Sequence, residues 1–138
     1  MKRHGFTKKI AIYSHMRNLQ QLDSDAPIIQ KIIDLYKELY GYLKTFPKKD
    51  QYLLGKRCED ALHGFLEYVL TAASLSKENK LRFLEVANGK FDALKVLLRV
   101  ARELRMLDNK KYLSLETKIQ EVGKMLGGWM KSLMTKTP

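Results

Sequence analysis

A histidine and three carboxylates form the grouping in this sequence that is best suited to metal or acid–base chemistry. They follow one another at spacings of three and four residues, which places them on one face of a helix: Glu59, Asp60, His63 and Glu67. A di-iron helical bundle would need a matching carboxylate–histidine set on other helices, and no second motif of this kind exists. The sequence therefore predicts a polar helix face with local pairing, and no metal site.

Other patterns that carry chemistry are missing from the sequence. There is no glycine-rich phosphate loop, no nucleophile elbow and no His-Glu-x-x-His motif. Cys58 is the only cysteine, so no intrachain disulfide and no cysteine-based zinc site can form, and a reducing compartment fits best. We therefore predict a cytoplasmic protein that is not an enzyme and needs no cofactor.

The charge of the chain favours a polyanionic partner. Lys+Arg total 26 against 15 Asp+Glu, which leaves a formal net charge of +11 on 138 residues. RNA and possibly DNA are the candidate partners, and the sequence does not indicate which of the two is preferred. A membrane is disfavoured, because no segment approaches the ~18 unbroken apolar residues of a span and the apolar face of residues 6–19 is short and has no tryptophan.

Apolar spacing predicts a single all-α domain built from four helices. Their predicted ranges are residues 28–44, 51–73, 77–106 and 110–134. The connections are short, so consecutive helices should run antiparallel in an up-down-up-down four-helix bundle spanning residues 27–138. Residues 1–26 are separated from it by Pro27 and form a basic N-terminal extension that need not be ordered on its own.

The spacing also predicts which side chains form the core. In the first helix the predicted face is Ile29, Ile32, Ile33, Tyr36, Leu39, Tyr40 and Leu43. In the fourth helix, steps of three and four run from Tyr112 through Leu126 to Leu133 and predict a bundle seam.

A basic series in the third helix could follow a phosphate backbone. Lys95, Arg99 and Arg102 are four and three residues apart and share one stripe, with Arg105 just off it. The alternative is an ordinary solvated face, in which Asp92 and Glu103 pair with these cations.

A second basic face is predicted on the fourth helix, where Lys124 and Lys131 share a heptad position with Lys110. Lysine is a point charge that contacts phosphate without reading bases, so we expect weak sequence specificity from this face.

Glycines in the fourth helix indicate a close approach. Gly123, Gly127 and Gly128 precede Trp129, and each glycine inside a helix costs up to ~1 kcal/mol relative to alanine. Packing against another helix of the same chain and a subunit interface both explain this cost, and the sequence leaves both open.

Five segments, taken in order and spacing, resemble the accessory variability determinant (Avd) proteins of diversity-generating retroelements, within the four-helix-bundle superfamily that includes rRNA intervening-sequence proteins. The segments are Asp34-Leu-Tyr-Lys-Glu-Leu-Tyr40, Phe46-Pro47-Lys48, Leu54-Gly55-Lys56-Arg57, Leu94-Lys95-Val-Leu-Leu98-Arg99 and Glu121-Val-Gly-Lys-Met-Leu-Gly-Gly-Trp129. The last is the most specific of them.

This resemblance implies a basic, barrel-shaped homopentamer that binds a reverse transcriptase and its template RNA and supports mutagenic complementary-DNA synthesis without performing chemistry. It also implies that Lys95 and Arg99 stand at basic positions tied to partner or nucleic-acid binding. Two alternatives remain: a structural bundle that oligomerises and has no nucleic-acid role, and a general RNA-binding bundle outside a retroelement.

Overall fold

The structure is a computed structural model that describes residues 27–134. Predictions for residues 1–26 and 135–138 lie outside the described residues. The long helices are α3 (Ile28–Leu43), α5 (Lys56–Ser74), α6 (Lys77–Glu103) and α7 (Asn109–Met134). A short helix, α4 (Lys48–Asp50), and a π-helical turn, η1 (Gln51–Gly55), lead directly into α5.

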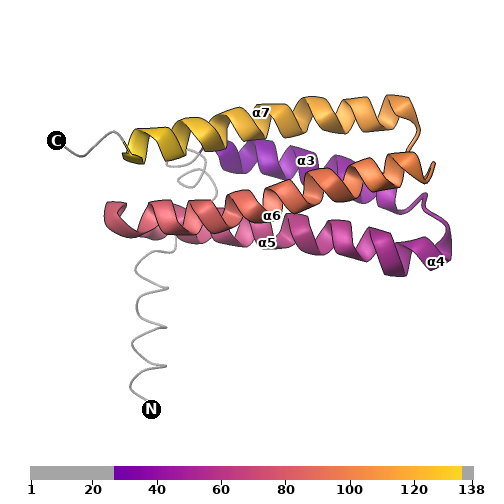
Figure 1. Ribbon diagram of the computed structural model, residues 1–138, viewed down its shortest axis with the longest axis horizontal. Helices are drawn as coiled ribbons and strands as arrows, with labels where there is room; N and C mark the ends of the chain where they lie inside the picture. The colour runs from indigo at the N-terminus through magenta and orange to yellow at the C-terminus, as the bar shows by residue number, and fades with distance from the viewer. Residues whose placement is uncertain (1–26, 135–138) are drawn as a thin grey trace, which may run out of the picture.

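The long helices pack side by side and alternate in direction, as Figure 1 shows. Helix α5 packs most closely on α6, and α7 contacts both α3 and α6. The predicted all-α bundle of four antiparallel helices is therefore confirmed for residues 27–134. The short connections explain this arrangement, because a link of two to five residues places the next helix antiparallel to its predecessor and beside it.

The core is continuous along the bundle and entirely apolar among the described residues. Its widest side chains include Phe65 and Phe91, whose rings stack with centroids 4.5 Å apart. The prediction for the first helix was wrong at Tyr40, which is 48% exposed, and omitted Leu35, which is fully buried. Tyr40 lies at the edge of the apolar stripe, where helical spacing alone cannot tell core from surface.

The connection between α3 and α5 is tight because one side chain closes it. Gln51 donates from Nε2 to the carbonyl oxygens of Lys44 (3.1 Å) and Phe46 (2.8 Å), which satisfies acceptors left at the end of α3. Phe46 is 2% exposed and anchors the loop in the core. A Cβ at Gly55 would come within 3.2 Å of the Asp50 carbonyl oxygen, so the π-turn favours glycine there.

The connection between α6 and α7 is a Schellman turn. The Met106 amide donates to the Ala101 carbonyl (2.8 Å) and the Arg105 amide to the Arg102 carbonyl (2.9 Å), while Arg105 has a φ of 65°. The predicted third helix therefore extends too far. The prediction placed its end at residue 106, whereas α6 ends at Glu103. Asp108 then caps α7 by accepting the Lys111 amide at 2.8 Å.

Ion pairs connect α3 to α7 along one side of the bundle. Lys118 lies 3.0 Å from Glu38, and Lys31 lies 3.1 Å from Glu121. Burial by itself raises the pKa of the Glu38 carboxyl, but hydrogen bonding from Ser114, Lys118 and Tyr42 outweighs it and leaves that pKa below its ordinary value. The carboxylate form of Glu38 is therefore the one that holds α3 against α7 at neutral pH.

Candidate nucleic-acid and partner interface

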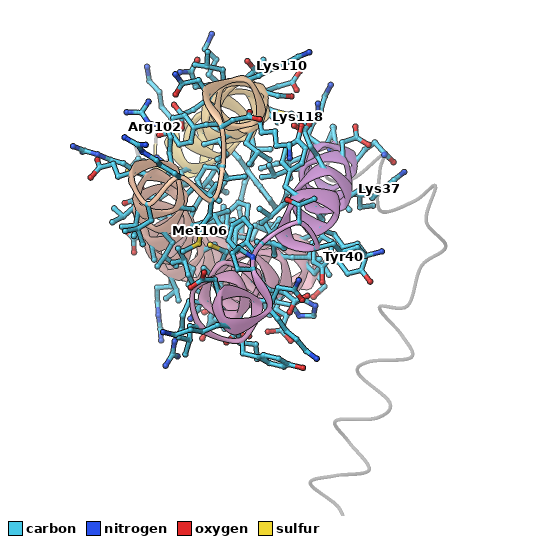
Figure 2. All side chains as sticks on the ribbon, turned by 90° about the vertical axis from the view of Figure 1, so that its right-hand side faces the viewer. Lys37, Tyr40, Arg102, Met106, Lys110 and Lys118 are labelled. Carbon is cyan, nitrogen blue, oxygen red and sulfur yellow. The ribbon has the colours of Figure 1, made fainter. Side chains whose placement is uncertain are left out.

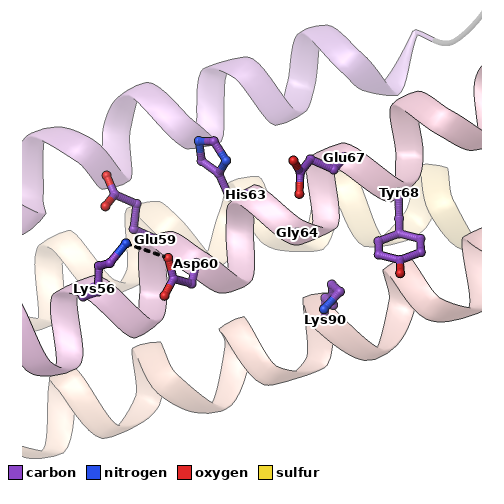
Figure 3. A pocket seen from close by; sticks show the side chains of 8 residues that line it. All are labelled: Lys56, Glu59, Asp60, His63, Gly64, Glu67, Tyr68 and Lys90. Carbon is purple, nitrogen blue, oxygen red and sulfur yellow. Dashed lines mark hydrogen bonds and ion pairs between the residues drawn. The ribbon is translucent and has the colours of Figure 1, made fainter. Parts of the chain in front are cut away.

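The carboxylates and the histidine singled out from the sequence lie along the outer face of α5, beside an open depression of about 520 Å³. Figure 3 shows these side chains spread along the helix and not converging on one point, with Lys90 reaching in from α6. Asp60 pairs with Lys56 at 3.1 Å, and the His63 ring packs edge-on against Tyr36 at 5.6 Å. Within residues 27–134, no group of three or more such side chains could hold a metal ion.

The cysteine offers no nucleophile. Cys58 is fully buried on the inner face of α5, and burial raises the pKa of its thiol to about 12. The thiol is therefore protonated at physiological pH and serves as a small apolar core group.

The basic stripe on α6 divides into two kinds of side chain. The Lys95 Nζ atom lies 3.1 Å from Oδ1 of Asp92, and the Arg99 Nε atom lies 2.9 Å from Oε2 of Glu103. These are the ion pairs expected if the stripe is an ordinary solvated face. Arg102 instead stacks its guanidinium carbon 4.8 Å from the centre of the Tyr112 ring. Exposed pairs of this kind are worth at most about 1 kcal/mol, so a phosphate can compete for Lys95 and Arg99.

The other predicted cations lie at different places along the bundle. Arg105 is exposed in the α6–α7 turn, next to Arg102, whereas Lys124 and Lys131 are exposed in the second half of α7. Because an α-helix rises 1.5 Å per residue, Lys131 lies ~30 Å along α7 from the turn. The six basic residues predicted from the sequence therefore do not form one cluster.

An uncovered apolar stripe runs along the outer face of α6, and the sequence analysis did not find it. Its large members are Val86, Val96, Val100 and Leu104, which are 45%, 62%, 37% and 59% exposed, with Gly89 and Ala93 exposed between them. The signal was present as a second set of three- and four-residue steps beside the core face of the same helix. Lys95 and Arg99 flank this stripe.

The glycines of α7 have different surroundings. A Cβ at Gly123 would meet the Phe91 ring at an ordinary contact distance of 3.6 Å, so the bundle itself approaches this residue. Gly127 and Gly128 are exposed, and apart from their chain neighbours and the adjacent backbone of α7 itself, no described atom lies within 4 Å of a Cβ at either. Trp129 is half-buried against the core, with Lys80 6.0 Å from its ring centre.

A family model described as bAvd-like matches residues 27–133. The chain belongs to this family of bacterial accessory variability determinants. A comparison with curated proteins found no match. The region matched by the bAvd-like model coincides with the helical bundle, so the family resemblance stated from five short segments is confirmed over the whole described body.

None of the described helices of this bAvd-like protein is long and apolar enough to cross a membrane. Family membership suggests an accessory protein of a diversity-generating retroelement. The α6 stripe, its flanking cations and two glycines of α7 are exposed on the surface of the bAvd-like bundle.

Replacing both Gly127 and Gly128 with alanine tests whether anything approaches them. In the monomer we expect the free energy of unfolding to rise by about 1–2 kcal/mol, because alanine is the better helix former and the added methyl groups meet open space. Urea unfolding at low protein concentration measures this. Gly64→Ala is the matched control, since its Cβ would lie 2.7 Å from Cδ of Lys90 and the gain should be offset. A destabilised double variant would contradict the open-space reading.

Proposed function

We propose that this chain is a non-catalytic accessory protein of a diversity-generating retroelement, which binds template RNA or its DNA copy together with a reverse transcriptase. One observation carries the proposal: the outer face of α6 presents uncovered apolar side chains directly beside Lys95, Arg99 and Arg102. Membership of the bAvd-like family supplies the retroelement context.

The charged part of this face suits a phosphate backbone. Lys95, Arg99 and Arg102 are all exposed, and a cation that neutralises a phosphate releases condensed counterions, which favours binding most strongly at low salt. Lys124 and Lys131 would extend the contact along α7, and Arg105 would extend it around the turn. Contacts of this kind position a nucleic acid without reading its sequence.

The apolar part of the face suits a subunit or protein partner. Isolated exposed apolar residues are normal, but a continuous apolar stripe on one helix is typical of a surface that is covered in the working assembly. We propose that the chain self-associates through this stripe, with Gly127, Gly128 and the rim of Trp129 as a further contact, in the pentamer that the family resemblance implies.

The first experiment is the absolute mass in solution, by light scattering on a sizing column, with and without a mixed-sequence RNA at low and moderate salt. A mass near five protomers that takes up RNA in a salt-sensitive manner supports both parts of the proposal. A monomer that ignores RNA would overturn both.

Charge reversal on α6 separates the proposal from its main alternative, a structural bundle whose charge only maintains solubility. We expect Arg99→Glu with Arg102→Glu to weaken RNA binding on the order of tenfold and to flatten its salt dependence, because two phosphate contacts become repulsive. Fluorescence anisotropy with a labelled RNA measures both. Arg82→Glu with Lys77→Glu makes the same change of charge near the start of the same helix, at two exposed residues. An equal loss in both pairs would favour the structural alternative.

A further inference from the structure

Lysines and arginines from four separate segments meet at one end of the bundle. This end contains the last turn of α3, all of α4, the turn between α6 and α7, and the first turn of α7, and it is the right-hand end in Figure 1. Figure 2 looks onto it and shows Arg102, Lys110 and Tyr40 around its rim. We name this surface the basic end; its cations are Lys44, Lys48, Lys49, Arg102, Arg105, Lys110 and Lys111.

Two of the carboxylates near the basic end are already engaged, and a third, Asp50 of α4, lowers the net positive charge there by one. Glu103 pairs with Arg99 at 2.9 Å, and Asp108 accepts the Lys111 amide at the start of α7. No ion pair between described residues includes any cation of the basic end. At the opposite end, by contrast, Lys80 donates its ammonium group to the carbonyls of Ala72 and Ala73 and caps α5.

Tyrosine rings hold several of these cations in place without neutralising them. The Lys44 ammonium lies 4.5 Å from the centre of the Tyr40 ring, and the Lys111 ammonium lies 5.5 Å from that of Tyr42. Arg102 stacks on Tyr112 in the same manner. A cation–π contact restricts the side chain but leaves its full charge for an anion, so the basic end is partly organised before any ligand arrives.

Two tyrosines at this end also expose their rings to solvent. Tyr52, in the π-turn, is 73% exposed, and Tyr40 is 48% exposed. The other described tyrosines are half-buried in helix packing. An exposed ring beside cations is the combination that binds single strands, because unpaired bases stack on the ring while phosphates contact the cations.

We infer that the basic end is a docking site for single-stranded nucleic acid, with Lys48, Lys49 and the turn arginines on the phosphates and Tyr52 as a stacking platform. The inference rests on the proposed function and adds a place and a strand state to it. A duplex gains less here, since its bases are already stacked on one another and cannot cover Tyr52. The strand would then lie across the end of the bundle and leave the α6 stripe free for subunit contacts.

The test uses the full chain, a labelled mixed-sequence 20-mer RNA, and the same sequence as a duplex. Lys48→Glu with Lys49→Glu should weaken single-strand binding on the order of tenfold or more and lower its salt slope by roughly 1.4, since each lost phosphate contact removes about 0.7. Lys77→Glu with Arg82→Glu changes the net charge equally at the opposite end and should weaken binding less than about threefold. Circular dichroism confirms that each variant is folded.

The ring is tested separately with Tyr52→Ala, an exposed position where truncation leaves the core unchanged. Single-strand binding should weaken by roughly fivefold or more, and duplex binding should not change. Equal losses in the two charge-reversal pairs, or equal binding of single strand and duplex by the wild-type chain, would overturn the inference while RNA binding itself stands. A wild-type chain that binds neither RNA would instead overturn the proposed function.

Discussion

Val96→Glu with Val100→Glu is expected to convert the assembled protein into folded monomers. Both side chains lie in the exposed stripe of α6, 62% and 37% exposed, so a glutamate carboxylate at either position can reach solvent in the isolated chain. In an interface built on the stripe, each carboxylate would be buried without a partner, and an uncompensated buried charge costs about 3–5 kcal/mol. Two such costs in every subunit contact exceed what an assembly at micromolar concentration tolerates.

Light scattering on a sizing column gives the mass of the variant, and circular dichroism gives its helix content. The matched control is Leu53→Glu with Leu113→Glu, which replaces two apolar side chains of similar exposure, 56% and 60%, outside α6. We expect the control to keep the wild-type mass. An assembled Val96→Glu, Val100→Glu variant would show that subunits meet elsewhere, with Gly127 and Gly128 as the next candidates.

The same variant connects assembly to nucleic-acid binding. If several protomers each present a basic end to one strand, the contacts after the first are intramolecular, and binding gains by effective concentration. Monomers should then bind a long RNA more weakly than the assembly does, while a 20-mer that fits one basic end is bound with little change. This comparison separates avidity from the affinity of a single site.

The helices and most of the core could be predicted from the sequence because each depends on local spacing. Leu62, Phe65 and Val69 repeat at three and four residues, the spacing of a helix face that packs in a core, and all three are buried on α5. The break at Phe46-Pro47 was also predictable, since proline ends the preceding helical segment. The end of α6 was not, because Arg105 adopts a positive φ that arginine rarely takes and that no spacing rule indicates.

The surfaces were harder to predict than the core, for a physical reason. A core residue can be identified from the apolar spacing within its own helix. An uncovered stripe is instead defined by the absence of a neighbouring helix, which only the packed bundle reveals. Val96 and Val100 are spaced like core residues of the same helix, and the sequence analysis did not single them out as a second apolar stripe. The basic end is harder still, because Lys48 and Lys110 are far apart in sequence and meet only when α4 and the α6–α7 turn reach the same end.

Phe91→Ala is expected to have the largest effect on stability, lowering the free energy of unfolding by about 3–5 kcal/mol. Phe91 is 1% exposed and stacks on Phe65 of α5, while α7 passes its ring at Gly123. Removing the ring opens a cavity where three helices meet, and these helices cannot close it without moving together. Because a domain of this size is stable by only about 5–15 kcal/mol, much of the total would be lost.

Urea unfolding followed by circular dichroism measures this loss, with Leu113→Ala, at a 60% exposed position, as the control that should change little. A change below about 1 kcal/mol in Phe91→Ala would contradict the packing described here. Gly123 supplies a sharper check, because a methyl group there lies 3.6 Å from the Phe91 ring. In the Phe91→Ala background that methyl group projects into the cavity, so Gly123→Ala should stabilise the chain more than it does beside the intact ring. The difference between the two gains is the coupling energy of the pair, and a coupling of zero would mean that Gly123 does not face Phe91 in solution.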